Sequence, residues 1–151
     1  MSRKNFEDFV DEIKELISEF IKLYNLLDRD EKACYEVTVQ QCCTLLAFEK
    51  RSKMTMNELS VELGLSSSTM TRNVDILVRR GYLERVRDDN DRRLVFVQLT
   101  EPGKELTAKL QQCECDFFAE ALRAIPESEW ENVASSLKLL LAALKVKGCC
   151  Q

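Results

Sequence analysis

Small hydroxyl side chains followed by arginines are the first group in this sequence whose types and spacing suggest a chemistry. The group consists of Ser66, Ser67, Ser68, Thr69, Thr71, Arg72, Asn73 and Arg79. Hydroxyls at the start of a helix can approach phosphates closely, and the helix N-terminus attracts anions. Arginine can donate two hydrogen bonds to a guanine edge, which is the commonest specific contact to DNA. A solvated helix face with an ordinary serine N-cap has the same composition, so this group alone leaves both interpretations open.

A second basic group surrounds an acidic turn a few residues later. It consists of Arg85, Arg87, Arg92 and Arg93, with the turn Asp88-Asp89-Asn90-Asp91 between the pairs. The flanking residues 83–87 and 94–99 have strand-like composition, so a β-hairpin with a basic tip is predicted. The narrow minor groove of DNA attracts arginine side chains. This hairpin favours nucleic-acid recognition over a plain solvated surface.

Seven cysteines are many for a chain of this size. They are Cys34, Cys42, Cys43, Cys113, Cys115, Cys149 and Cys150. On a helix, Cys113 and Cys115 would be about 200° apart and Cys42 and Cys43 about 100° apart, so neither pair closes on one ion. Cys113 falls on an apolar stripe and Cys42 or Cys43 on a short apolar helix, so packing explains these positions too.

The terminal pair Cys149 and Cys150 follows Gly148, which should end the last helix. Nearby Lys145 and Lys147 favour thiolates. With a third sulfur from Cys34, Cys42, Cys43 or Cys113, these thiolates would suit As(III), Sb(III) or a cysteine-only Zn(II) site. The alternative is a redox sensor in which oxidation links two thiols.

The sequence has no histidine, which removes the commonest general base and metal ligand. It also has no glycine-rich phosphate loop and no clustered pair of carboxylates, so no reaction type can be assembled from its residues. We therefore predict that the chain is not an enzyme and requires no cofactor.

Helical periodicity predicts the elements that carry these groups. Apolar residues recur with a helical period over residues 2–27, and a shorter helix is predicted over 37–48. Thr55 and Glu58 form a capping-box pattern that begins a third helix, and Gly64 is placed to end it. Ser66 can cap a fourth helix that stops at Gly81.

Two more helices are predicted after the hairpin. One begins at Thr100-Glu101-Pro102, and the other follows Pro126 with near-heptad apolar spacing. The three long amphipathic helices expose more apolar surface than one small module can cover, which predicts a homodimer. The predicted fold class is mainly α: a winged helix-turn-helix over residues 35–100 in a single domain of 1–151, with dimerisation helices at 1–30 and 101–148.

The charge distribution agrees with a local basic surface on an acidic body. The net charge is −4, but residues 50–93 hold 10 basic and 7 acidic side chains. No apolar run is long enough to span a bilayer, and the first residues lack the apolar segment of a signal peptide. A cytoplasmic location without membrane contact is expected.

Residues 57–106 hold a series of short motifs at characteristic spacing: Glu58-Leu59-Ser60, Leu65-Ser66, Thr71-Arg72, Val74, Leu77, Gly81-Tyr82-Leu83, Arg85, Asp91-Arg92-Arg93 and Leu99-Thr100-Glu101-Pro102-Gly103. In these motifs the segment resembles the DNA-binding region of the MarR family of bacterial transcription regulators. The resemblance implies a homodimer that binds a pseudo-palindromic operator in double-stranded DNA, with a recognition helix in the major groove and a wing in the minor groove. It further implies that Asp91 steadies the wing residue Arg93, and that the protein is a transcription regulator, which we expect to act as a repressor.

The resemblance leaves the signal that controls DNA binding open. Soft-metal or metalloid ligation by the cysteines is one candidate, and thiol oxidation or a phenolic ligand are the alternatives. A soft-metal-binding protein whose winged module contacts other proteins is an alternative of another class.

Overall fold

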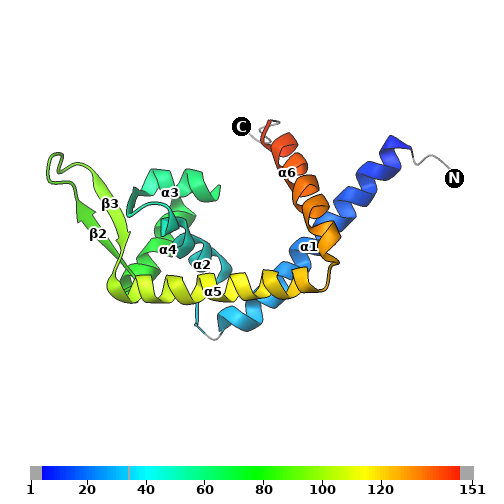
Figure 1. Cartoon of the computed structure of the whole chain (residues 1–151). Helices are drawn as coiled ribbons and strands as arrows, with labels where there is room; N and C mark the ends of the chain where they lie inside the picture. The colour runs from blue at the N-terminus through cyan, green and yellow to red at the C-terminus, as the bar shows by residue number, and fades with distance from the viewer. Residues whose placement is uncertain (1–4, 34, 147–151) are drawn as a thin grey trace. The chain divides into compact units, whose positions relative to one another are not determined.

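The computed structural model describes residues 5–33 and 35–146, which form six α-helices, two short 3₁₀ helices and three strands (Figure 1). The helices are α1 (Phe6–Ala33), α2 (Val39–Leu46), α3 (Met56–Leu63), α4 (Ser67–Arg79), α5 (Glu101–Arg123) and α6 (Trp130–Val146). The strands are β1 (Lys53–Thr55), β2 (Leu83–Arg87) and β3 (Val95–Leu99), and the 3₁₀ helices are η1 (Ala47–Glu49) and η2 (Glu127–Glu129). The chain divides into two compact units, residues 1–111 and 112–151. The predicted mainly α, winged helix-turn-helix fold class is confirmed.

The core of the first unit lies between α2, α3, α4, the sheet and the start of α5. Its fully buried side chains include Cys42, Leu45, Met54, Leu59, Met70, Val74, Leu77 and Val97. Met70, Val74 and Leu77 repeat at helical spacing, so they form the buried face of α4 that the sequence pattern predicts. Burying this face leaves the opposite face of α4 in solvent.

The helix ends follow the predicted local signals. Thr55 and Glu58 form the capping box of α3, with the Glu58 carboxylate accepting from the Thr55 N–H at 2.7 Å. Gly64 ends α3 with φ of 61°, a left-handed conformation that glycine adopts without steric cost. Ser66 caps α4 by accepting a hydrogen bond from the Thr69 N–H. These caps place α3 and α4 as the two helices of the helix-turn-helix.

The sheet is antiparallel with strand order β1-β3-β2, and β2 and β3 form the wing. The sequence pattern does not predict β1, because three residues are too few to show an alternating period. Met54 of β1 pairs with Val97 of β3, and both side chains are fully buried. Strand β1 is therefore formed by its tertiary contacts, and it anchors the base of the wing to α3.

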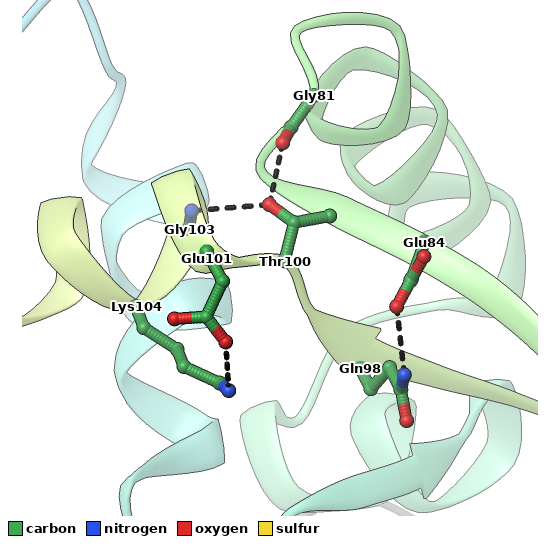
Figure 2. A network of polar contacts seen from close by, with 7 residues as sticks. All are labelled: Gly81, Glu84, Gln98, Thr100, Glu101, Gly103 and Lys104. Carbon is green, nitrogen blue, oxygen red and sulfur yellow. Dashed lines mark hydrogen bonds and ion pairs between the residues drawn. The ribbon is translucent and has the colours of Figure 1, made fainter.

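A polar network joins the end of α4 to the start of α5 (Figure 2). The Thr100 hydroxyl donates to the Gly81 carbonyl at 2.5 Å and accepts from the Gly103 N–H at 3.1 Å. The Thr100 N–H donates to the Tyr82 carbonyl at 3.1 Å. Thr100 therefore caps α5, as predicted, and also fixes the first turn of α5 against the segment that enters the wing.

Helix α1 is longer than its predicted extent of residues 2–27, because it continues to Ala33. The loss of the apolar period after residue 27 therefore does not mark the end of the helix. The extension Asp28-Arg29-Asp30-Glu31-Lys32-Ala33 is rich in good helix formers, so low apolar content did not end the helix.

Large apolar side chains of α1 are exposed in the first unit, among them Phe6, Phe9, Leu16 and Phe20. The second unit likewise exposes Leu137, Leu139, Leu141 and Leu144 on α6. Within this unit, the Trp130 indole N–H donates to the Leu122 and Ile125 carbonyls and ties the start of α6 to the end of α5. In the described part of the chain, no helix combines the length and the apolar character that crossing a membrane requires. The predicted division into a winged part and dimerisation helices stays a prediction.

Candidate nucleic-acid interface

The outer face of α4 carries most of the residues predicted to contact DNA. Its side chains line a shallow hollow of about 450 Å³ formed by Ser67, Ser68, Thr71, Arg72, Asp75 and Arg79. Except for the half-buried Asp75, these residues are exposed. Because α4 buries its apolar face in the core, this polar face is held outward by a rigid element.

The hydroxyl groups at the start of α4 are organised by the helix cap. The Ser66 hydroxyl lies 3.1 Å from that of Ser68 and 2.9 Å from that of the half-buried Thr69. The Thr71 hydroxyl donates to the Ser67 carbonyl at 2.8 Å. Ser66 and Thr69 thus complete the cap, while the Ser67, Ser68 and Thr71 side chains present oxygen atoms at the surface.

Asn73 is not on this outer face, so its predicted placement there is wrong. Its side chain is only 7% exposed, and its Nδ2 atom has no hydrogen-bond partner. Asn73 follows Met70 by three positions and precedes Leu77 by four, which places it on the buried face of the helix. Asn73 directly follows Arg72 in the sequence, but on a helix the two side chains point in different directions.

We expect Asn73→Leu to raise the free energy of unfolding by about 1 kcal/mol, because it removes a buried donor that lacks a partner. Urea unfolding followed by circular dichroism measures the change. Asn73→Asp is the matched control and should destabilise the fold, because it buries a charge in the same volume. A lower midpoint for Asn73→Leu would mean that the amide contributes a favourable interaction.

The arginines of the wing occupy two different environments. Arg92 and Arg93 are exposed at the tip. Arg85 instead extends toward α4, where its Nη2 atom lies 2.5 Å from the Asp75 Oδ1 atom. Arg79 of α4 remains exposed, with its Nε–H directed at the Asp75 carbonyl at 3.4 Å. The basic surface of the wing is therefore concentrated at its tip.

Hydrogen bonds to carboxylates shape the turn at the wing tip. The Asp88 carboxylate accepts from the Asn90 N–H at 2.7 Å and from the Asp91 N–H at 3.3 Å. The Asp91 carboxylate accepts from the backbone N–H of Arg93 at 3.0 Å. Asp91 therefore holds Arg93 through its backbone, and the Arg93 side chain is left in solvent.

The hydrogen bonds from Asn90 and Asp91 lower the pKa of the Asp88 carboxyl below its ordinary value of 3.8, with a smaller contribution from Lys53. A carboxyl whose pKa is lower when folded stabilises the fold above its unfolded pKa and loses that effect as the pH falls through the folded value. We therefore expect the wing turn to loosen below about pH 4.

NMR titration of the Asn90 and Asp91 amides, which donate to Asp88, measures this loosening. The Asp88→Asn variant should lose the acid-dependent change, whereas Asp89→Asn, which removes the same charge from the adjacent residue, should retain it. An unchanged titration in Asp88→Asn would contradict the assignment to Asp88.

The structure adds two residues that the predicted site did not include. Asp75 lies in the hollow of α4 and binds Arg85. Lys53 of β1 lies 3.9 Å from the Asp88 carboxylate and 4.2 Å from the centre of the Phe96 ring. Lys53 is one of the basic residues of the segment 50–93, but only the pairing of β1 with β3 brings it to the wing.

The cysteines are distributed over separate environments. Cys42 is buried, Cys43 and Cys113 are half-buried, and Cys115 is exposed. Cys34, Cys149 and Cys150 lie outside the described residues. Among residues 5–33 and 35–146, no group of three or more His, Cys, Asp or Glu side chains could hold a metal ion. The predicted thiolate site thus depends on cysteines outside this part of the chain.

A helix-turn-helix with an exposed polar second helix and a basic β-hairpin defines a winged helix-turn-helix protein. A sequence model of the MarR family matches residues 35–94. The match covers less than half of the chain and shows that the segment holding α2, α3, α4 and β2 is similar to the MarR family. Members of this family are DNA-binding transcription regulators and not enzymes, in agreement with the prediction that this chain is not an enzyme.

Individual relatives extend the similarity. The transcriptional repressor MprA of Escherichia coli is 34% identical over 88 residues, which cover 58% of this chain and 50% of MprA. The chain spans about half the length of the first curated relatives it matches. A MarR family protein from Bacillus stearothermophilus has a TM-score of 0.84 and 24% identity, covering 94% of this chain and 99% of that chain. A mutant of MarR from E. coli complexed with operator DNA has a TM-score of 0.76 and 24% identity, covering 91% and 99%.

Proposed function

We propose that this protein is a transcription regulator, acting as a repressor, that binds a pseudo-palindromic operator in double-stranded DNA as a homodimer. The observation that carries the proposal is the joint display, on one compact unit, of the α4 face and the basic wing tip. The similarity of residues 35–94 to the MarR family and the likeness to a DNA-bound MarR support this proposal.

The geometry suits readout of two neighbouring grooves. Helix α4 would enter the major groove, where Arg72 can reach base edges while Ser67 and Ser68 approach phosphates. The wing tip would follow the adjacent minor groove, which attracts arginine side chains such as Arg92 and Arg93. The modest excess of basic residues implies that placement of these groups matters more than bulk charge.

The homodimer is supported by exposed apolar side chains in both units. Continuous apolar surfaces on a helix are costly in water and commonly mark association sites. The faces of α1 and α6 that hold Phe6, Phe20, Leu137 and Leu141 have this character. Two recognition helices related by a twofold axis would read half-sites about one helical turn apart.

The test is fluorescence anisotropy with labelled duplex DNA at two salt concentrations. Each phosphate contact should contribute about −0.9 to the slope of log affinity against log salt, so binding should weaken steeply as salt rises. Affinity that is absent or insensitive to salt would reject DNA binding. It would favour the alternative of a soft-metal-binding protein whose winged module contacts other proteins.

Control of DNA binding is proposed to use the cysteines, with a soft metal or metalloid ahead of oxidation. Ligation or oxidation would favour a dimer whose recognition helices no longer reach successive major grooves. A gel shift with arsenite, Zn(II), peroxide and salicylate compares wild type with Cys149→Ser/Cys150→Ser. Release by arsenite or zinc only in wild type supports thiolate ligation, and release by peroxide supports redox control. Release by salicylate alone supports the phenolic-ligand alternative, and no response to a thiol reagent rejects cysteine sensing.

A further inference from the structure

An ion pair connects the wing to the recognition helix at the point where the wing leaves the core. Arg85 is the third residue of β2, and its guanidinium meets the Asp75 carboxylate of α4 at 2.5 Å. Leu83, two positions earlier on the same strand, is buried, whereas residues 84–87 are exposed. The pair therefore lies at the boundary between the anchored and the projecting part of β2.

Two other polar side-chain contacts of the hairpin do not reach α4. The Glu84 carboxylate accepts from the Gln98 side chain at 2.7 Å, which joins β2 to β3 inside the hairpin (Figure 2). Lys53 approaches Asp88 from β1 at 3.9 Å, which supports the opposite edge of the sheet. Of these three polar contacts, only that of Arg85 with Asp75 reaches the helix that carries Arg72.

We propose that Asp75 is a positioning residue for DNA recognition, which through Arg85 fixes the orientation of the wing relative to α4. The DNA-binding part of this inference rests on the proposed function. Reading two neighbouring grooves requires both elements at a set angle before binding, because ordering them during binding lowers affinity. Asp75 does this at the cost of a negative charge on the recognition surface, which a purely electrostatic surface would not carry.

The energetics separate positioning from stability. The two side chains are 38% and 46% exposed, and an exposed ion pair contributes little to folding. Substitution should therefore leave the unfolding midpoint nearly unchanged while the orientations available to the wing increase. The matched control is Glu84→Gln, which removes the same charge from the hairpin without touching the link to α4.

The first experiment needs no DNA. Residual dipolar couplings of backbone amides in α4 and the β2–β3 hairpin report the relative orientation of the two elements in the full-length protein. In wild type and Glu84→Gln, both elements should fit one alignment tensor. In Asp75→Asn, the hairpin couplings should shrink, and the charge-swapped Asp75→Arg/Arg85→Asp variant should restore them. Unchanged couplings in a folded Asp75→Asn protein would overturn the proposal even if the protein binds DNA.

The second experiment is a double-mutant cycle, which tests whether the ion pair of Asp75 and Arg85 affects DNA recognition. Arg93→Ala should weaken duplex binding in wild type, and this loss should be about two- to fivefold smaller in the Asp75→Asn background. The loss caused by Arg72→Ala, which lies on α4 itself, should be the same in both backgrounds. If the effects of Asp75→Asn and Arg93→Ala on binding are additive, while the wild type binds DNA, the positioning role of Asp75 is rejected and the proposed function is not.

Discussion

The Gly103→Ala variant is expected to lower the free energy of unfolding by about 1–3 kcal/mol or more. An added Cβ atom would lie 1.9 Å from the Tyr82 carbonyl oxygen and 2.9 Å from the Tyr82 carbonyl carbon. Both are backbone atoms, and the Tyr82 carbonyl also accepts a hydrogen bond from Thr100, so it cannot move aside alone. The first turn of α5 would have to separate from the segment that enters the wing.

The expected loss of stability is opposite in sign to the effect that helix propensity alone predicts. Gly103 lies inside α5, and helix propensity alone would have alanine stabilise the helix by about 1 kcal/mol. Urea unfolding measures the difference in the free energy of unfolding. The protein concentration is held fixed, because the stability of the proposed homodimer would depend on it. Gly64→Ala is a suitable comparison, because it has open space around the added atom and only the left-handed backbone cost of about 1–2 kcal/mol. A Gly103→Ala protein as stable as wild type would mean that the close approach of α5 is not required.

Arg72→Ala is expected to cost about 1–3 kcal/mol of discrimination between an operator and a duplex altered at the contacted base pair. Arg72 is exposed on the outer face of α4 beside Thr71, so its guanidinium can enter the major groove without rearrangement of the helix. Competition titrations with matched and altered duplexes measure the ratio of affinities. The affinity for the altered duplex should change much less than that for the operator.

The matched comparison is Arg93→Ala at the wing tip. Its loss should be similar for all duplexes, and the salt slope should fall by about one, because a phosphate or minor-groove contact carries little base information. Equal and small effects of both substitutions would refute the docking of α4 in the major groove. If only Arg93→Ala lowers the discrimination between operator and altered duplex, the wing rather than α4 recognises the base sequence.

Local sequence signals determined the boundaries of the helix-turn-helix. Each of these signals acts within four residues of the chain, so it can be recognised without tertiary information. They are the capping box of Thr55 and Glu58, the left-handed Gly64 and the N-cap Ser66. The cap at Thr100 was predictable for the same reason, and the hairpin of β2 and β3 was predictable because two strand-like segments flank a short polar turn. The end of α1 was not, because the loss of its apolar period did not remove its helix propensity.

Only the tertiary structure decided which polar side chains belong to the candidate interface. Sequence proximity grouped Asn73 with Arg72, but packing of α4 on the core buries Asn73 and exposes Arg72. Likewise, Asp75 and Arg85 are ten positions apart on different elements, and β1 forms only by pairing with β3 across more than forty residues. The sequence by itself thus determined the helix-turn-helix, because its boundaries depend on short-range backbone signals, and it showed the resemblance of this region to the MarR family. The tertiary structure determined which residues contact the wing, because these contacts join elements far apart in the sequence and no local pattern encodes them.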